Sequence, residues 1–214
     1  MNVVLLHAFP LDERMWEPQL AAVEGHDFVI PNLYELGENS VDAWASHLLS
    51  EIRGELVLVG ASMGGYVALA MARQAPERVP ALLVAGSRAT PDPPDRRALR
   101  EEMIRVVREQ GIAGWNREFS PPGPSDRTIE ELVGGIEALR DRPDASEVVR
   151  SFVGPLVVVV GDRDDILPVD EARQISEAAP DGRLEVVEGA GHLVNIDAPK
   201  RFNAILLELL RRPR

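Results

Sequence analysis

The sequence predicts an α/β fold in three layers, with a parallel sheet between two layers of helices. Short, continuous apolar runs recur along the 214 residues, at 3–6, 28–30, 56–59, 81–85, 156–160 and 184–187. Their Val, Ile and Leu content, without polar alternation, is typical of strands that are covered on both faces. Stretches of helical length lie between most of these runs, and this alternation favours parallel strands joined by crossover helices.

Four helices are expected between or after these runs. Residues 40–52 place Trp44 and Leu48 on one helical face, and residues 199–210 do the same with Phe202 and Leu209. Proline then sets the limits of the other two. The Ala- and Met-rich segment 64–73 stops before a proline at position 76, and the segment 170–179 ends at one at position 180.

One stretch, residues 87–153, interrupts the alternation because it contains no convincing strand. Pro-rich segments at 90–95 and 120–125 flank two expected helices, at 95–110 and 128–139. A helical excursion between two strands of one sheet is most simply a cap over the carboxyl edge. We therefore expect a single domain over 1–214, with its core at 1–86 and 154–214 and a helical cap at about 87–153.

The composition excludes several classes of protein. The chain has 23 Lys and Arg against 35 Asp and Glu, a net charge of −12, which disfavours binding to nucleic acid or to an anionic membrane surface. Cysteine is absent from the sequence, so disulfides, thiolate metal sites and cysteine nucleophiles are excluded. No apolar run is long enough to span a bilayer, and the first residues do not resemble a signal peptide, so we expect a cytoplasmic protein.

A nucleophile candidate follows the third apolar run directly. Gly60-Ala61-Ser62-Met63-Gly64 matches G-x-S-x-G between a predicted strand and a predicted helix. This pattern forms a sharp turn that lifts the serine hydroxyl out of the backbone, and the turn requires small neighbouring residues. The alternative is a glycine-rich connection with a capping serine. Partner residues decide between the two interpretations.

A serine nucleophile needs a base, and the base needs an acid to orient it. His192 is the favoured base, because it follows the run 184–187 and its flanking glycines leave room for the ring. His26 and His47 are interpreted as surface residues, and His7 ends the first strand. In the loop after 156–160, the acid candidates are Asp162, Asp164 and Asp165; for the first and last a solvated position is preferred. Loops beyond the carboxyl ends of parallel strands converge on one crevice, where such groups can meet.

With these motifs in place, the sequence resembles the α/β-hydrolase superfamily, near its small serine esterase, enol-lactonase-like and perhydrolase-like branches. The segment 7–12, HAFPLD, resembles the family's HG-type motif, with Ala8 in place of the usual glycine, and 60–65 matches the nucleophile elbow. Gly161-x-x-Asp164-x-x-x-Pro168 matches the acid loop, and Gly189-x-Gly191-His192 matches the histidine segment. The resemblance covers almost the whole chain and implies about six parallel strands, no N-terminal hairpin and a short helical cap.

The resemblance also implies roles for individual residues. Ser62, Asp164 and His192 correspond to the catalytic triad, and the backbone N–H groups of Phe9 and Met63 correspond to the oxyanion hole. Phe9, Met63 and Trp115 are expected to contact substrate, whereas His7 is expected to brace the oxyanion loop. No cofactor and no metal are expected.

The function predicted in this way is hydrolysis of small carboxylic esters through an acyl-enzyme, as in carboxylesterases. Lactone or enol-lactone hydrolysis and perhydrolysis use the same triad and stay open as alternatives, as does a ligand-binding protein with slow turnover. The expected partner is a small ester or lactone; the sequence does not determine the acyl or alcohol preference, nor the oligomeric state.

Overall fold

Six parallel strands form one open sheet, in the order β2-β1-β3-β4-β5-β6, in a computed structural model that describes residues 1–119 and 127–211. All six predicted strands are present, with small shifts at their ends. The strands are β1 (Asn2–Leu6), β2 (Asp27–Val29), β3 (Leu56–Ala61), β4 (Ala81–Ala85), β5 (Leu156–Gly161) and β6 (Gly182–Val187). Because β1 pairs with both β2 and β3, the winding of the chain reverses there, and a crevice is expected at the carboxyl ends of β1 and β3.

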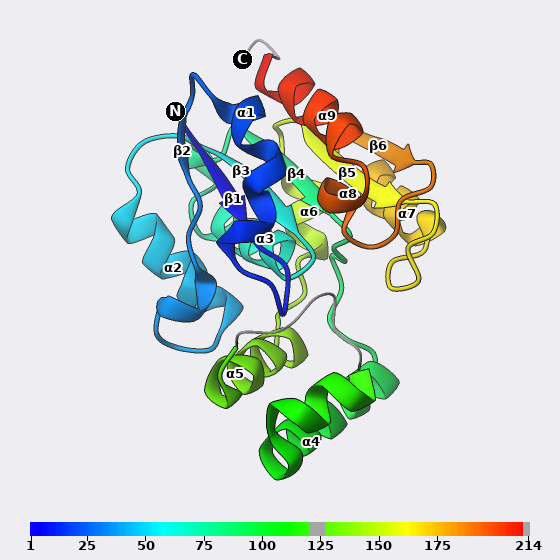
Figure 1. Ribbon diagram of the computed structural model, residues 1–214. Coiled ribbons are helices and arrows are strands. Elements are labelled where there is room, and N and C mark those ends of the chain that lie inside the picture. Colours follow the sequence, from blue (N-terminus) through cyan, green and yellow to red (C-terminus); the bar gives the residue numbers. More distant parts are fainter. Residues whose placement is uncertain (120–126, 212–214) are drawn as a thin grey trace.

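Helices cover both faces of the sheet, so the predicted three layers are confirmed (Figure 1). One face carries α2 (Val41–Glu51), α3 (Met63–Gln74), α6 (Ser146–Ser151) and α7 (Val169–Ala178). The other carries η1 (Glu13–Gln19), α1 (Leu20–Val23), α8 (Val194–Asp197) and α9 (Pro199–Arg211). Two short 3-10 helices, η2 (Leu33–Glu35) and η3 (Pro76–Arg78), lie in connections.

Successive strand residues divide between two hydrophobic cores. Leu58 of β3 packs in the core beneath α2 and α3, and the next residue, Val59, packs in the core beneath α9. This follows from the alternating direction of side chains along a strand. The sequence does not predict η1, α1 and α8, because segments this short leave little periodic signal. No helix within the described residues is long and apolar enough to cross a membrane.

Two helices of the inserted segment lie beyond the carboxyl ends of the strands. These are α4 (Pro94–Phe119) and α5 (Ile129–Arg140), which pack on each other through a small core of their own (Figure 1). The predicted helix end at residue 110 corresponds to a break at Gly111, whose φ is 64°, after which the helix resumes. The predicted Pro-rich segment 120–125 lies outside the described residues.

The last helix of the predicted cap segment packs on one face of the sheet. Val148 and Val149 of α6 are buried in the core that contains α3, so this helix lies in the helical layer on that face and not above the carboxyl edge. The boundaries of the cap at 87 and 153, and the division into core and cap, stay predictions.

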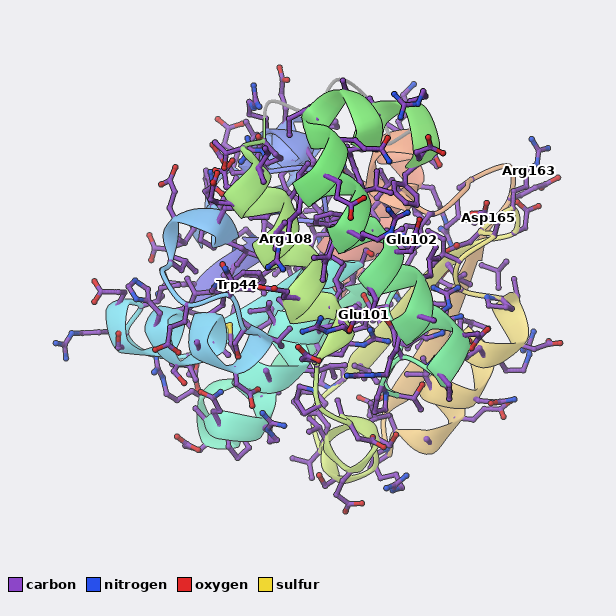
Figure 2. All side chains as sticks on the ribbon, turned by 90° about the horizontal axis from the view of Figure 1, so that it is seen from below. Trp44, Glu101, Glu102, Arg108, Arg163 and Asp165 are labelled. Atoms are coloured by element: carbon purple, nitrogen blue, oxygen red, sulfur yellow. The ribbon has the colours of Figure 1, made fainter. Side chains whose placement is uncertain are left out.

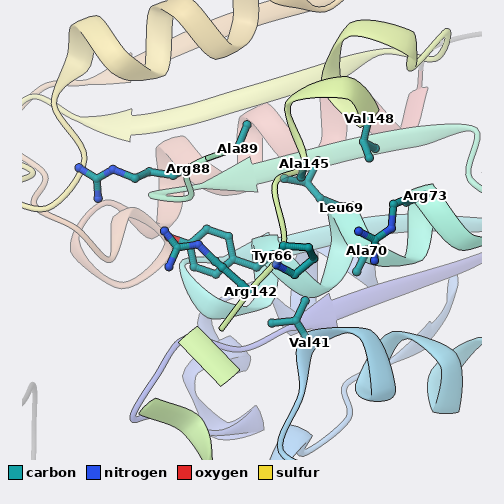
Figure 3. A pocket seen from close by; sticks show the side chains of 11 residues that line it. Val41, Tyr66, Leu69, Ala70, Arg73, Arg88, Ala89, Arg142, Ala145 and Val148 are labelled. Atoms are coloured by element: carbon teal, nitrogen blue, oxygen red, sulfur yellow. The ribbon is translucent and has the colours of Figure 1, made fainter. Parts of the chain in front are cut away.

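A buried ionic cluster lies where the inserted segment meets the sheet. The Asp92 carboxylate forms ion pairs with Arg142 at 2.7 Å and with Arg100 at 3.1 Å. The side chains of Asp92 and Arg142 are 1% and 2% exposed. Burial alone would raise the pKa of Asp92, but the hydrogen bond and charge of Arg142, with those of Arg100, hold it below its ordinary value. Arg142 also lies over the Tyr66 ring of α3, 4.3 Å from its centroid, beside a cavity of about 10 Å³ (Figure 3).

A fully buried histidine closes the end of β1. His7 Nε2 accepts a hydrogen bond from the Leu33 N–H at 2.9 Å, and its Nδ1 lies 3.2 Å from the Ala8 carbonyl oxygen. The ring is therefore neutral and protonated on Nδ1. Burial lowers its pKa from 6.5 to about 4. His7 thus ties the loop after β1 to the turn after β2.

We expect Asp92→Asn to lower the free energy of unfolding by about 3–5 kcal/mol, because it removes the counter-charge of a buried arginine. Asp141→Asn is the control, since Asp141 is 51% exposed and its ion pairs with Arg97 and Arg140 lie at the surface, where their loss should cost less than about 1 kcal/mol. Urea unfolding at neutral pH measures both. Equal, small losses in the two variants would contradict the importance of the Asp92 cluster.

A second prediction concerns how the free energy of unfolding depends on pH, and it follows from the lowered pKa of His7. Between pH 6.5 and pH 4 the unfolded chain binds a proton at His7 that the folded protein does not, so stability falls as the pH falls. We expect this group to contribute a loss of about 2 kcal/mol between pH 7 and pH 5. His7→Gln should flatten the pH dependence, whereas His47→Gln, at an exposed site, should retain it. Identical slopes in the two variants would refute the prediction.

Candidate active site

Ser62 occupies a strained turn between β3 and α3. Its φ and ψ are 48° and −109°, and within the described residues it is the sole residue other than glycine with a positive φ. Such a conformation costs about 1–3 kcal/mol and persists only where the surroundings impose it. Here the Ser62 N–H donates to the Ala85 carbonyl at 2.7 Å, and Ser87 Oγ donates to the Ser62 carbonyl at 2.9 Å. The turn is thereby held against the end of β4.

Two glycines on either side of Ser62 are required by close approach of the backbone. A Cβ atom on Gly60 would lie 2.4 Å from the backbone of Gly64, and one on Gly64 would lie 2.0 Å from the Leu6 carbonyl oxygen. Any larger residue would push α3 away from the strands. The pattern that marks this turn in the sequence is therefore a steric requirement of the fold.

The structure brings Ser62, His192 and Asp164 together from three separate loops. Ser62 Oγ and His192 Nε2 are 2.9 Å apart, and His192 Nδ1 lies 2.9 Å and 3.0 Å from the two carboxylate oxygens of Asp164. A carboxylate can only accept, so Nδ1 carries the ring proton and Nε2 is free to accept from the serine hydroxyl. The side chain of His192 is 16% exposed, and that of Asp164 is fully buried.

Asp164 is held as a carboxylate by its surroundings. Its Oδ1 also accepts hydrogen bonds from the backbone N–H groups of Ile166 and Leu167, at 2.8 Å and 2.9 Å. Burial alone would raise the pKa of Asp164, but the hydrogen bond and charge of His192 and these two amides outweigh it and keep the pKa below its ordinary value. The group is therefore ionised near neutral pH.

The loop that carries His192 is positioned by two further carboxylates. Asp162 accepts a hydrogen bond from the Gly189 N–H at 2.7 Å, and Asp197 accepts one from the Gly191 N–H at 2.8 Å. Asp162 is exposed, as expected for a solvated position, but its side chain also reaches the neighbouring loop, which no local pattern reveals. Sequence reasoning also missed Asp197, which lies in α8 after the histidine segment.

The imidazole ring of His192 also needs space, which Gly86 provides, because a Cβ there would lie 2.9 Å from His192 Cε1.

The side chains of Phe9 and Met63 differ in their surroundings: one lines the cavity at Ser62 and the other lies in the core. The Phe9 ring faces the cavity and packs edge-on against Trp115, with ring centroids 5.6 Å apart. The Met63 side chain is fully buried in the core between sheet and helix and is not part of the cavity lining, so a contact of Met63 with substrate is left to its backbone. The reason is that the side chain of the first residue of α3 points into the sheet. Its backbone N–H lies in the first turn of the helix, where an intrahelical acceptor is missing.

A cavity of about 770 Å³ lies between Ser62 and the helices above the carboxyl edge. Ser62 and His192 form part of its floor, and Trp115, as predicted, is among its lining residues. Further apolar side chains come from α4: Leu99, Met103 and Phe119. Seen from this side, α4 and α5 lie across the edge of the sheet, with Glu101, Glu102 and Arg108 on α4 (Figure 2).

Asp165 lies on the loop at the rim of this cavity, near Arg163 (Figure 2). It is exposed and has no hydrogen-bond partner in the described parts of the chain, in contrast to Asp164. No cluster of three or more His, Asp or Glu side chains with metal-binding geometry occurs among residues 1–119 and 127–211.

Comparison with known proteins finds relatives and solved structures that align with almost the whole of this chain. A thermophilic esterase from Thermogutta terrifontis is 27% identical and superposes with a TM-score of 0.90 over 99% of this chain and 89% of that one. The pimeloyl-acyl-carrier-protein methyl ester esterase of Citrobacter koseri is 26% identical over 99% of this chain and 94% of its own length. The acetyltransferase component of an acetoin cleaving system from Pseudomonas putida is also 26% identical, and there the chain spans 63% of the relative's length.

The family model described as "Alpha/beta hydrolase family" matches residues 3–205, which include all six strands and the loops that carry Ser62, Asp164 and His192. The sheet order, the turn at Ser62 and the esterase relatives agree with this match. The chain belongs to the alpha/beta hydrolase family.

Proposed function

We propose that this protein is a serine hydrolase of small carboxylic esters, with Ser62 as the nucleophile. The observation that carries the proposal is the pair of 2.9 Å contacts that link Ser62 Oγ to His192 Nε2 and His192 Nδ1 to Asp164. A serine hydroxyl is a weak nucleophile until a base accepts its proton, and this arrangement supplies that base in the correct tautomer. The esterase relatives support the same class of reaction.

In the acylation step, Ser62 Oγ attacks the ester carbonyl carbon while His192 Nε2 takes the hydroxyl proton. Asp164 stabilises the resulting imidazolium by its charge and does not itself take the proton. The negative oxygen of the tetrahedral intermediate is assigned to the backbone N–H groups of Phe9 and Met63. The positive end of α3 adds to the stabilisation of that oxygen.

The intermediate collapses when its C–O bond to the alcohol breaks and His192 returns the proton to the departing oxygen. This leaves the acyl group bound to Ser62. A water molecule then attacks the acyl carbon, with His192 as base, and the acid is released with Ser62 regenerated. Lactones fit the same steps, with the departing alcohol tethered to the acyl group.

Removal of the Ser62 hydroxyl should abolish turnover. We expect Ser62→Ala to lower kcat on p-nitrophenyl esters by about 10⁵–10⁶-fold, as in other serine triads. Because Ala is smaller and the turn is held by backbone contacts, the fold should persist, which circular dichroism checks. Labelling by a fluorophosphonate should occur in the wild type and be lost in the variant. Activity above a tenth of the wild-type value would exclude Ser62 as nucleophile.

A separate prediction concerns the loss of kcat when each aspartate of the acid loop is replaced. Asp164→Asn should lower kcat by about 10⁴-fold, because an amide no longer selects the His192 tautomer with its proton on Nδ1. Asp165→Asn is the matched control on the same loop and should lose less than about tenfold. Asp162→Asn keeps an oxygen that can accept from the Gly189 N–H, so it should also be far milder than Asp164→Asn. Similar losses in all three variants would show that the acid is misassigned.

A further inference from the structure

One guanidinium group in the cavity above Ser62 has no carboxylate partner. Arg96, in the first turns of α4, lines the same cavity as Ser62 and His192. Its Nη2 donates to the Ile166 backbone carbonyl at 3.1 Å. In residues 1–119 and 127–211, no carboxylate forms an ion pair with it, and no other group accepts from it. Since a guanidinium carries several N–H donors, most of those of Arg96 remain available to a ligand.

Two of the nearby carboxylates, Asp92 and Glu171, are paired with other arginines. Arg100 and Arg142 share Asp92, at 3.1 Å and 2.7 Å. Arg88, in turn, is paired with Glu171 at 2.8 Å. Asp92 and Glu171 therefore serve Arg88, Arg100 and Arg142, and Arg96 has no carboxylate of its own in the described structure.

The surroundings of Arg96 disfavour its charged form. Its pKa is lowered from the ordinary value, first by burial and then by the charge of Arg88, while Asp92 opposes and Arg100 adds to the shift. Asp95, Asp165 and Asp197 also line the cavity, but all three are exposed and none is paired with Arg96 in the described structure. Water screens the charges of these exposed carboxylates. They therefore neutralise Arg96 less than a ligand anion in direct contact with it would.

A purely structural role for Arg96 is the alternative. The Ile166 carbonyl also accepts from Arg88 at 2.6 Å, and the Ile166 N–H donates to Asp164. Arg96 would then only brace the acid loop, and its loss would slow the hydrolysis of every substrate to the same extent. Selectivity between charged and neutral substrates separates the two roles.

We propose that Arg96 binds an anionic group of the substrate, and that the substrate class is an ester that carries a carboxylate, such as the half-ester of a dicarboxylic acid. The inference rests on the proposed ester hydrolysis at Ser62. One unpaired guanidinium in a cavity that is also lined by the apolar side chains of Leu99, Met103 and Trp115 suits a singly charged carboxylate on an aliphatic chain.

The test compares methyl half-esters of dicarboxylic acids of increasing length with their ω-carboxamides, which have the same shape without the charge. For the wild type we expect kcat/KM to favour the carboxylate by about 10- to 100-fold at the best length, the range of a charge-assisted hydrogen bond. Arg96→Gln should bring this ratio close to one, mainly through KM. Arg97→Gln, on the same helix at an exposed ion pair, should preserve the ratio.

Each outcome has a distinct meaning. If Arg96→Gln lowers kcat/KM equally for both esters, Arg96 only braces the loop and the proposal is overturned. If the wild type cleaves both esters at Ser62 without preferring the carboxylate, the proposed hydrolase stands and the anion site does not. If the wild type cleaves neither these esters nor a p-nitrophenyl ester, the proposed function fails. Binding of glutarate to Ser62→Ala by calorimetry, with and without Arg96→Gln, then still decides the anion site: equal affinity refutes it.

Discussion

The strained turn at Ser62 couples the packing of β3, β4 and α3 to the position of the serine hydroxyl. A left-handed conformation at a residue with a side chain survives only because the end of β4 holds its backbone and because Gly60 and Gly64 allow β3 and α3 to touch. The same turn places the hydroxyl at the carboxyl edge of the sheet and the first N–H groups of α3 beside it. Fold stability and the proposed chemistry therefore rest on the same few atoms.

Around that point, loops from different strands are cross-linked by polar side chains. His7 ties the loop after β1 to the turn after β2, and Asp162 ties the loop after β5 to the one that carries His192. Each of these contacts joins residues that are distant in sequence, so they restrict how the loops move relative to one another. The proposed proton transfer needs such rigidity, because it depends on a donor and an acceptor held at hydrogen-bond distance.

The helices above the sheet differ in character from the sheet itself. They meet it through a buried ionic cluster around Asp92, and they contribute both apolar walls and the cationic Arg96 to the cavity. This segment is the hardest part to predict from sequence, since its helices carry many charged residues and a kink at Gly111. Its contacts depend on pairs such as Arg142 and Asp92, which are about 50 positions apart.

The strands, the main helices and the turn at Ser62 could be predicted from the sequence, because these depend on local patterns of apolar residues, glycine and proline. The position of His192 after a strand, between glycines, favoured it as the base, and the resemblance to a family then selected Asp164 from three aspartates. Contacts between distant loops were needed to establish that Asp162 supports the histidine loop, that the Met63 side chain belongs to the core, and which cationic groups are neutralised. These properties depend on which loops meet in space, and no local pattern in the chain encodes that.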